Sequence, residues 1–532
     1  MSVPLDYLII GAGPAGLQLA HSLGEAGRDY LVLESGSAPG TFFSHFPRHR
    51  QLISSNKPHT GTTDPELNLR MDWNSILSPD PGLLFTRYTE RYFPAADDMV
   101  RYLGDFARTL DLRISYGSRV TEVRRDAGGF AVTTGGGQVH HARQVVVATG
   151  VSRPYIPPVP GIELAEQYAD VTVEPRDFLD QRVLILGKGN SALETAANLI
   201  ETAAVIHVAG PSPIRLAWKT HYVGHLRAVN NNFLDTYQLK SQNAVLDGSV
   251  RSIEKTGDGQ YLVRFAFSRA NELVKELRYD RVICCTGFRF DASILGPDCQ
   301  PVLLHSGRFA ELTSAYELAG VPGVYAAGTI MQQRDFKRST GGFIHGFRYA
   351  VRALHHILEL RHHGVDWPAH PVAATPAALT EAVLARVNRT SALWQQFGVL
   401  ADAIVLEPGG GARYLAEVPV DFVLDGGLGD LHGELASVLL VTLEYGPDHD
   451  RVDPFDITVS RVAQDDADHA YDAAYLHPVL RWYRDGQLAA VHHVAENLEN
   501  EWDKPAHRDP LTAFLTAQLS AGLATAGAEV TP

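Results

Sequence analysis

The stretch Asp6-Tyr-Leu-Ile-Ile-Gly-Ala-Gly-Pro-Ala-Gly16 decides the fold of this chain. Residues 6–10 predict a short buried strand, and the three glycines open an amphipathic helix that we expect to end near Ala26. A second apolar strand, residues 30–33, ends in Glu34, 18 residues after the third glycine. A strand, a glycine loop, a helix and a second strand with a terminal acid form the fingerprint of a dinucleotide-binding unit.

Each residue of this loop has its own expected role. Gly11 permits the tight turn, Gly13 lets the backbone approach a pyrophosphate, and Gly16 lets the helix pack on the sheet. The helix N-terminus stabilises the phosphate charge, and Glu34 binds ribose hydroxyls. A glycine-rich turn without a ligand is the alternative, and the complete context argues against it.

A second unit of the same kind opens at Arg182. Residues 183–186 predict its strand, a helix follows to about Glu201, and residues 205–208 predict the next strand. Its loop holds the cofactor candidates Gly187, Gly189, Asn190, Ser191 and Ala192. No acid ends the second strand, and the cations Arg215 and Lys219 follow it. This pattern favours the 2′-phosphate of NADP over the bare ribose of NAD, and a solvated basic face is the alternative.

The remaining pattern predicts an α/β fold of two Rossmann-like units plus a C-terminal α+β region. Short alternating segments in 116–150 predict a β-meander, and residues 279–287 repeat the strand-to-Thr-Gly pattern that closes it. An apolar strand near 323–329 and a long helix at 342–363 return the chain to the first unit. We therefore expect a first dinucleotide-binding domain in two parts, 1–153 and 289–368, with a second, NADPH-binding domain, 154–288, inserted between them, and a C-terminal region, 369–532.

The C-terminal region carries no nucleotide fingerprint. We expect a helix at 377–394, a strand at 435–444 and a closing helix at 511–523. Its aromatic and apolar segments argue against a solvated tail. The region is expected to pack on the two-domain core, either as a lid over the cofactor pocket or as the interface of a homodimer.

Composition excludes several classes of protein. The 46 basic and 61 acidic residues give a net charge of −15, which argues against a nucleic-acid or membrane-surface partner. The start has no basic segment before an apolar core, and no apolar run is long enough for a membrane span, so we expect a cytoplasmic protein. The three cysteines, Cys284, Cys285 and Cys299, include no C-x-x-C pair, and we expect no metal site.

The order of these segments resembles that of flavoproteins with two dinucleotide-binding domains. Tyr92-Phe-Pro94 and Gly189-Asn-Ser-Ala192 look like the flavin-containing monooxygenase branch. The chain is still more similar to the FAD-dependent oxidoreductase-domain family, whose named member is an ER-lumen protein. That resemblance is carried by residues 46–57, 98–107, 341–349 and 476–481. The signal and retention segments of the ER-lumen protein are not seen here.

The resemblance implies which residues hold FAD. The loop, Glu34 and the helix N-terminus take the AMP half, Val120 contacts the adenine, and Gly328 and Thr329 meet the ribityl chain. The helix that starts near Gly342 points its N-terminus at the isoalloxazine ring. The implied FAD-binding residues are Gly11, Gly13, Pro14, Ala15, Gly16, Glu34, Ser35, Val120, Thr149, Gly150, Gly328, Thr329, Gly342 and Phe343.

One segment departs from the monooxygenase pattern. Residues 168–178 keep the aromatic spacing of a class B signature, but Asp170 stands for its glycine and Glu174 for its histidine. This departure weakens the monooxygenase assignment and leaves the FAD and NADPH assignments intact.

The electrons of reduced flavin have two possible acceptors, a cysteine pair and O₂. A dithiol relay is disfavoured because adjacent side chains at Cys284 and Cys285 point to opposite faces of a strand. The other route is reaction with O₂, which gives a flavin hydroperoxide that oxygenates a small molecule. Asn56 and Lys57 are the catalytic candidates, with a solvated loop pair as the alternative. Arg334, Lys337 and Arg338 are expected either to attract a carboxylate or to form a surface cluster, and His345 to relay a proton or fill the core.

Two functions follow from this chemistry. The first is an FAD- and NADPH-dependent monooxygenase that uses O₂ on a small-molecule substrate, by N-oxygenation of an amine or amino acid in specialised metabolism. The second is a flavin oxidoreductase that passes electrons from NADPH to a partner protein or small acceptor. The missing C-x-x-C favours the first function.

Overall fold

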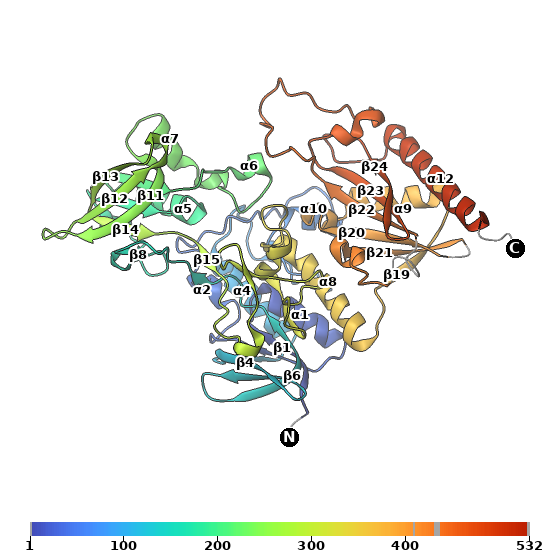
Figure 1. The fold of residues 1–532 in the computed structure, drawn as a ribbon, viewed down its shortest axis with the longest axis horizontal. Coiled ribbons are helices and arrows are strands. Elements are labelled where there is room, and N and C mark those ends of the chain that lie inside the picture. The colour runs from blue at the N-terminus through green and yellow to red at the C-terminus, as the bar shows by residue number, and fades with distance from the viewer. Residues whose placement is uncertain (1–2, 408–409, 430–436, 529–532) are drawn as a thin grey trace.

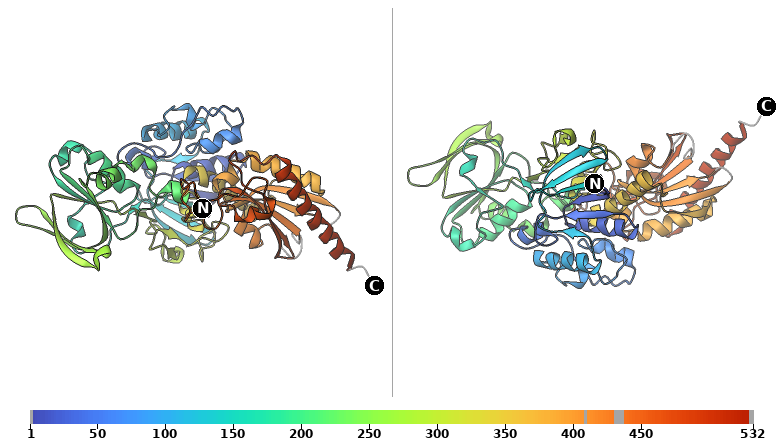
Figure 2. Two further views of the ribbon diagram at one scale, coloured as in Figure 1. Left: turned by 90° about the horizontal axis from the view of Figure 1, so that it is seen from above. Right: turned by 90° about the horizontal axis from the view of Figure 1, so that it is seen from below.

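The computed structural model describes residues 3–407, 410–429 and 437–528, with side chains to residue 521. Three large sheets form three bodies, as Figure 1 shows. The views in Figure 2 place the body with the first sheet in the middle and the other two at opposite ends. The N-terminal body therefore contacts both of the others.

The first sheet has the strand order β3-β2-β1-β6-β5-β4, and β18 pairs with β6 beside β5. Strands β2, β1, β6 and β18 run parallel, while β4, β5 and β6 form the expected meander. The strands are β1 (Leu5–Ile10), β2 (Tyr30–Leu33), β3 (Ile114–Ser115), β4 (Val120–Asp126), β5 (Gly129–Thr134), β6 (Val139–Val147) and β18 (Val324–Ala326). The helices of this body are α1 (Pro14–Glu25), α2 (Thr41–His45), α3 (Pro65–Met71), α4 (Ala96–Thr109) and α8 (Ile344–His363).

The second sheet lies between β6 and β18 in the chain and has the order β13-β12-β11-β10-β9-β14-β8. Its strands are β8 (Glu166–Gln167), β9 (Arg182–Leu186), β10 (Val205–Gly210), β11 (Ala244–Lys255), β12 (Tyr261–Phe267), β13 (Leu273–Tyr279) and β14 (Arg281–Cys284). Its helices are α5 (Asn190–Leu199), α6 (Ala217–Thr220) and α7 (Asn232–Gln238). The short pair β7 (Arg153–Pro154) and β15 (Phe288–Arg289) joins this body to the first.

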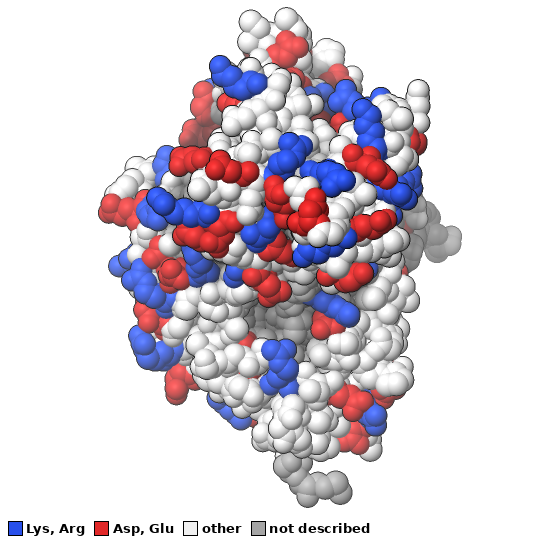
Figure 3. Space-filling view, turned by 90° about the vertical axis from the view of Figure 1, so that its left-hand side faces the viewer, with Lys and Arg blue, Asp and Glu red and all other residues white. Residues whose placement is uncertain are grey.

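The outer face of the second body carries charges of both signs. Figure 3 shows Lys and Arg beside Asp and Glu over this end of the molecule. Exposed pairs such as Arg251–Glu272 and Arg264–Glu276 account for part of this mixture. Neither sign dominates the face shown.

The third sheet is antiparallel, with the order β19-β21-β20-β22-β23-β24. Its strands are β19 (Ala369–Ala373), β20 (Leu400–Leu406), β21 (Gly411–Pro419), β22 (Ser437–Glu444), β23 (His477–Arg484) and β24 (Gln487–His493). Its helices are α9 (Pro376–Arg389), α10 (Ala392–Gln395), α11 (Val420–Leu424) and α12 (Pro505–Ala528). The α/β class with a C-terminal α+β region is confirmed. No helix within the described ranges is long and apolar enough to cross a bilayer.

The helix expected at 377–394 is in fact two helices. Helix α9 ends at Arg389, and α10 starts only at Ala392. The guanidinium of Arg70, far away in the chain, donates hydrogen bonds to the carbonyls of Val387, Asn388 and Thr390. These hydrogen bonds satisfy backbone carbonyls where the chain passes from α9 to α10. The strand expected at 435–444 begins at Ser437, and residues 435–436 lie outside the described ranges.

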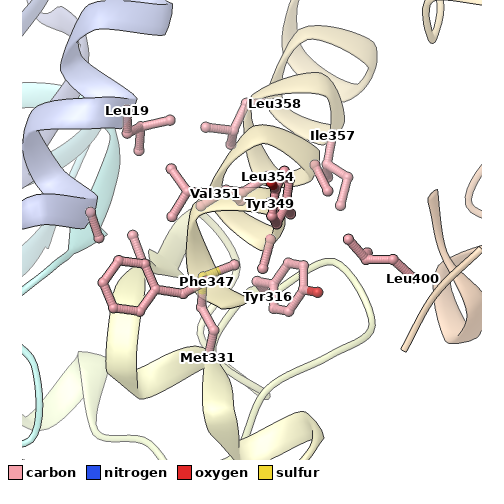
Figure 4. Packing of buried hydrophobic residues seen from close by; sticks show 14 of the residues in the cluster. Leu19, Tyr316, Met331, Phe347, Tyr349, Val351, Leu354, Ile357, Leu358 and Leu400 are labelled. Carbon is pink, nitrogen blue, oxygen red and sulfur yellow. The ribbon is translucent and has the colours of Figure 1, made fainter. Parts of the chain in front are cut away.

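Helix α8 holds the first and third bodies together. Its apolar side chains face in two directions, as Figure 4 shows, with Leu19 of α1 on one side and Leu400 of β20 on the other. Val351, Leu354 and Leu358 are fully buried in one continuous core that runs through both bodies. The C-terminal region therefore packs on the FAD-type unit, as expected from its composition.

A buried ion network reinforces this contact. Arg352 of α8 and Arg386 of α9 both bind the carboxylate of Glu417, Arg386 at 2.7 Å. Arg386 also donates to Asp402 at 2.8 Å, and Asp402 is fully buried. Tyr414 donates a further hydrogen bond to Asp402. Each buried carboxylate thus has a cationic partner, as burial of charge requires.

We predict that Arg386→Met unfolds the C-terminal region much more readily, because it leaves Asp402 buried without its cation. The expected loss in free energy of unfolding is roughly 3–5 kcal/mol. The matched control is Arg413→Met, whose pair with Glu407 is about half exposed, and there we expect less than about 1 kcal/mol. Urea titration followed by tryptophan fluorescence measures both, and equal losses would contradict the role given to the network.

Candidate functional site

The first glycine loop is shaped for a ligand in front of α1. Gly11 has φ +108°, and a Cβ there would lie 2.8 Å from the carbonyl oxygen of Ala148. A Cβ on Gly16 would overlap the carbonyl of Gly11 at 2.0 Å, so the helix can pack this closely only without a side chain. A Cβ on Gly13 meets no atom within 4 Å. The loop is therefore tight on its inner side and open on its outer side.

The acid at the end of β2 reaches this loop. Glu34 is buried, and its Oε2 accepts a hydrogen bond of 2.8 Å from the backbone N–H of Ala12. Its Oε1 accepts from the N–H of Gly36 and the hydroxyls of Ser35 and Thr41. Glu34 thus ties β2 to the loop and fixes its own orientation.

Residues far apart in the chain meet at the same place. A Cβ on Gly328 (φ +81°) would lie 2.8 Å from Cβ of Ala15, so Gly328 packs directly on the start of α1. Thr329 donates its hydroxyl to the carbonyl of Gly342, just before α8, at 3.3 Å. Phe343 caps α8 without a side-chain hydrogen bond. Gly328 and Thr329 therefore connect the start of α1 with the segment just before α8.

These features fit FAD. The Oγ1 of Thr149 is buried and has no hydrogen-bond partner, and the space outside Gly13 is open. The starts of α1 and α8 lack side-chain caps, so their N–H groups remain available to anionic groups. Of the other expected residues, Pro14 opens α1, Val120 is buried at the start of β4, and Gly150 (φ +66°) has open space beside it.

The second glycine loop repeats this geometry. Gly187 has φ +122°, and a Cβ there would lie 2.2 Å from the carbonyl oxygen of Cys285. A Cβ on Gly189, which caps α5, meets nothing within 4 Å, and Ala192 is fully buried. Asn190 turns its side chain to the protein instead, donating to the carbonyl of His225 and accepting from the N–H of Arg227.

The cations beyond β10 are partly as expected. Arg215 is exposed, Lys219 is half-buried in α6, and neither forms an ion pair with a described residue. Sequence reasoning missed Lys188, whose buried side chain lies beside Gly210 at the end of β10 and pairs with Asp247. Position 188 varies freely in the glycine pattern, so only the fold reveals this cation.

The two catalytic candidates differ in their surroundings. Asn56 is 1% exposed, and its amide donates to the carbonyls of Thr89 and Arg91, at 2.8 and 3.1 Å, while its Oδ1 has no partner. Lys57 is exposed and has no ion pair with any residue that the structure describes. The donor groups of Asn56 therefore hold the 89–91 loop, and only its oxygen is free.

His345, the candidate proton relay or core residue, lies in an aromatic cluster at the start of α8. His345 is 2% exposed, neither ring nitrogen has a partner, and its ring stacks on Trp73 with centres 4.3 Å apart. Burial, with the nearby charges of Arg348 and Arg227, lowers the pKa of His345 well below its usual value. The imidazole is therefore neutral at physiological pH.

A pocket lies beside the second loop. It is lined by Tyr155, Tyr168, Ser191, Cys285 and Phe288, among others. Glu194 lies near Tyr168 and Cys285, and burial raises the pKa of its carboxyl to about 7. No described residue donates a hydrogen bond to this carboxyl, which makes it an unusual group next to a cofactor loop.

Residues 218–222 of the second body contact both of the other bodies. Gln332, before α8, donates to the hydroxyl of Tyr222 of the second body at 2.9 Å. The third body reaches the same segment, since His221 stacks on Tyr445 at 4.2 Å and Trp218 contacts Phe455 at 5.1 Å. In Figure 1, α6 accordingly lies beside loops of the third body.

Comparison with known proteins agrees with this geometry. Residues 8–328 match the family of pyridine nucleotide-disulphide oxidoreductases. The mouse FAD-dependent oxidoreductase domain-containing protein 2 is 40% identical over 98% of this chain and 85% of its own length. The bacillithiol disulfide reductase of Staphylococcus aureus has a TM-score of 0.53 at 20% identity, over 68% of this chain and all of its own. A flavin-containing monooxygenase from Stenotrophomonas maltophilia has a TM-score of 0.51 at 21% identity, over 66% and 98%.

The two structural neighbours share the fold of flavoproteins with two dinucleotide-binding domains. The predicted resemblance, the enzyme class and the cofactors FAD and NADP(H) are confirmed at the level of the family. The chain belongs to the pyridine nucleotide-disulphide oxidoreductase family and, within it, to the family of FAD-dependent oxidoreductase domain-containing protein 2.

Proposed function

We propose that this protein is an FAD-dependent, NADPH-using monooxygenase that oxygenates a small molecule with O₂. N-oxygenation of an amine or amino acid is the reaction we favour. The observation that carries the proposal is the state of the thiols. All three cysteines of the chain are buried and unpaired.

Burial makes these thiols poor electron carriers. It raises the pKa of Cys284 and, more strongly, that of Cys285, so neither forms the thiolate that disulfide exchange requires. Burial also raises the pKa of Cys299, to about 11. A dithiol relay inside the chain is therefore disfavoured, and O₂ is an acceptor that needs no protein thiol.

The residues of the first site are proposed to hold FAD. Gly13 and the start of α1 bind its pyrophosphate, Glu34 its ribose, and Thr149 and Thr329 further polar groups. When bound, FAD supplies hydride acceptance and reaction with O₂. The start of α8, at Gly342 and Phe343, stabilises negative charge next to it.

The second site is proposed to hold NADPH. Gly189 and the start of α5 bind the pyrophosphate, and Arg215 and Lys219 bind the 2′-phosphate. Tyr222, bound to Gln332, and His221, stacked on Tyr445, are proposed to close the space between the two sites and to exclude water, which oxygenation requires. The free Oδ1 of Asn56 is proposed to accept a hydrogen bond from the substrate side of the site, and Lys57 to contribute charge at its edge.

Other features remain predictions. They are the domain boundaries at 153, 288 and 368, the cytoplasmic location, the homodimer and the absence of a nucleic-acid partner. The alternative function is electron transfer from NADPH to a partner protein or small acceptor without oxygenation.

We predict that Gly13→Val and Gly189→Val separate the two sites. Both residues cap a helix with extended backbone, φ −79° and −89°, and a Cβ at either meets no protein atom, so each variant should fold. Gly13→Val should reduce bound FAD to less than about a tenth of one per chain, because the side chain fills the pyrophosphate space. Gly189→Val should keep FAD and lose reduction by NADPH.

Flavin absorbance after gel filtration measures the first effect, and anaerobic bleaching by NADPH measures the second. Full FAD occupancy in Gly13→Val would show that the first loop does not hold the cofactor.

We predict that O₂ is a better acceptor than a disulfide. With NADPH in excess, the rate with O₂ should exceed that with a small aromatic disulfide by at least about tenfold, because no reactive thiol relays electrons. NADPH oxidation at 340 nm, under air and anaerobically with the disulfide, measures this ratio. A faster disulfide reaction would favour the reductase alternative.

A further inference from the structure

The side chain of Arg227 lies where the second body meets the first. Its backbone N–H donates to Oδ1 of Asn190, in the second glycine loop, at 3.0 Å. Its Nη1 donates to the carbonyl of Ile53, in the first body, at 2.7 Å. Its guanidinium carbon lies 5.2 Å from the ring centre of Trp73. A positive charge thus stands between the loop proposed for NADPH and the aromatic cluster at the start of α8.

This charge has no anionic partner among the described residues. Burial lowers the pKa of the Arg227 guanidinium, and no carboxylate in the described ranges pairs with it to oppose this effect. Nε and Nη2 donate no hydrogen bond to a described residue, and the side chain is half-buried, so this edge is left for a ligand. A half-buried guanidinium without a counter-charge is costly unless a ligand supplies one.

The free donors have the geometry of a carboxylate receptor. Nε and Nη2 lie on the same edge of the planar guanidinium, and two parallel N–H groups on one edge match the two oxygens of a carboxylate. The other edge is occupied by Ile53. Arg227 therefore presents one pair of N–H donors, and its contacts with Asn190 and Ile53 fix its position between the two bodies.

The neighbouring charges favour the same ligand. The fully buried Arg348 donates only to the carbonyls of Leu69, Asp72 and Ser75, so it adds positive potential. Burial and the charges of Arg348 and Arg227 lower the pKa of His345, so it stays neutral. By contrast, Arg334 is paired with Asp421, and Arg338 donates to the carbonyl of Arg334, so these predicted cations are already engaged.

We propose that Arg227 binds the carboxylate of an anionic substrate and places that substrate against Trp73. This inference rests on the proposed function, because it needs the flavin at the start of α8. The nicotinamide ring is neutral when reduced and positive when oxidised, so it does not require this cation. The pyrophosphate of NADPH has Gly189 and α5. A substrate carboxylate is the remaining anion.

Benzoate and benzamide, which have nearly equal shape but differ in charge and in one acceptor oxygen, test this assignment on the FAD-loaded full chain. Benzoate should perturb the flavin absorbance and bind at least about tenfold more tightly than benzamide, as one charged fork predicts. Arg227→Gln should weaken benzoate by at least about tenfold, and Arg227→Lys, which keeps charge but loses the fork, by less. The binding of NADP⁺ should be unchanged in both variants.

The matched control is Arg289→Gln. Arg289 is also half-buried and lies over an aromatic ring, 3.6 Å from that of Tyr155, without an ion pair in the described chain, but it lies in the strand pair that joins the bodies. Its loss should leave benzoate binding unchanged. Equal binding of benzoate and benzamide, or an unchanged benzoate constant in Arg227→Gln, would overturn the proposal, and so would a matching loss of NADP⁺ affinity. Loss of FAD from the unsubstituted protein would instead refute the proposed function.

Discussion

The burial of α8 on two sides is the constraint on which the molecule depends. One side packs on α1 through residues such as Leu19, and the other packs on the third sheet through Leu400. Because α8 also begins at Phe343, the same packing that joins two bodies fixes the position of a helix N-terminus. The C-terminal region therefore belongs to the architecture of the cofactor site, although it carries no nucleotide-binding motif.

Buried arginines pair with carboxylates in one part of the interior and only with carbonyl oxygens in another. Between α8 and the third sheet, Arg352 and Arg386 meet Glu417 and Asp402, and the charges are balanced. Around Trp73, Arg227 and Arg348 meet only carbonyl oxygens, and the charges are unbalanced. Balanced charges hold a fold together, whereas unbalanced ones persist where a ligand completes them.

The sequence predicts the parts of the site that depend on local backbone. The glycines at 11, 16 and 187 are required by turns and close approaches that involve neighbouring strands, so the pattern alone locates them. Glu34 follows from its place at the end of β2. The structure adds that its carboxylate is held by Ala12 and Gly36.

Contacts between distant segments cannot be predicted in this way. Arg70 donates to the carbonyls at the break of the helix expected at 377–394 from more than 300 positions away. Asn56 looks like a free loop amide in the sequence, but its donors hold the 89–91 loop. Arg227 and Trp73 are brought together only because two bodies dock, and no spacing rule links them.

The central claim is that NADPH-reduced protein transfers its electrons to O₂ without releasing them at once as H₂O₂. Stopped-flow absorbance, with anaerobically reduced protein mixed into O₂-saturated buffer, tests it most directly. The account predicts that the visible band of oxidised flavin returns only after a delay, and that little H₂O₂ appears during that delay. Immediate return of the band, with one H₂O₂ formed for each flavin, would contradict it.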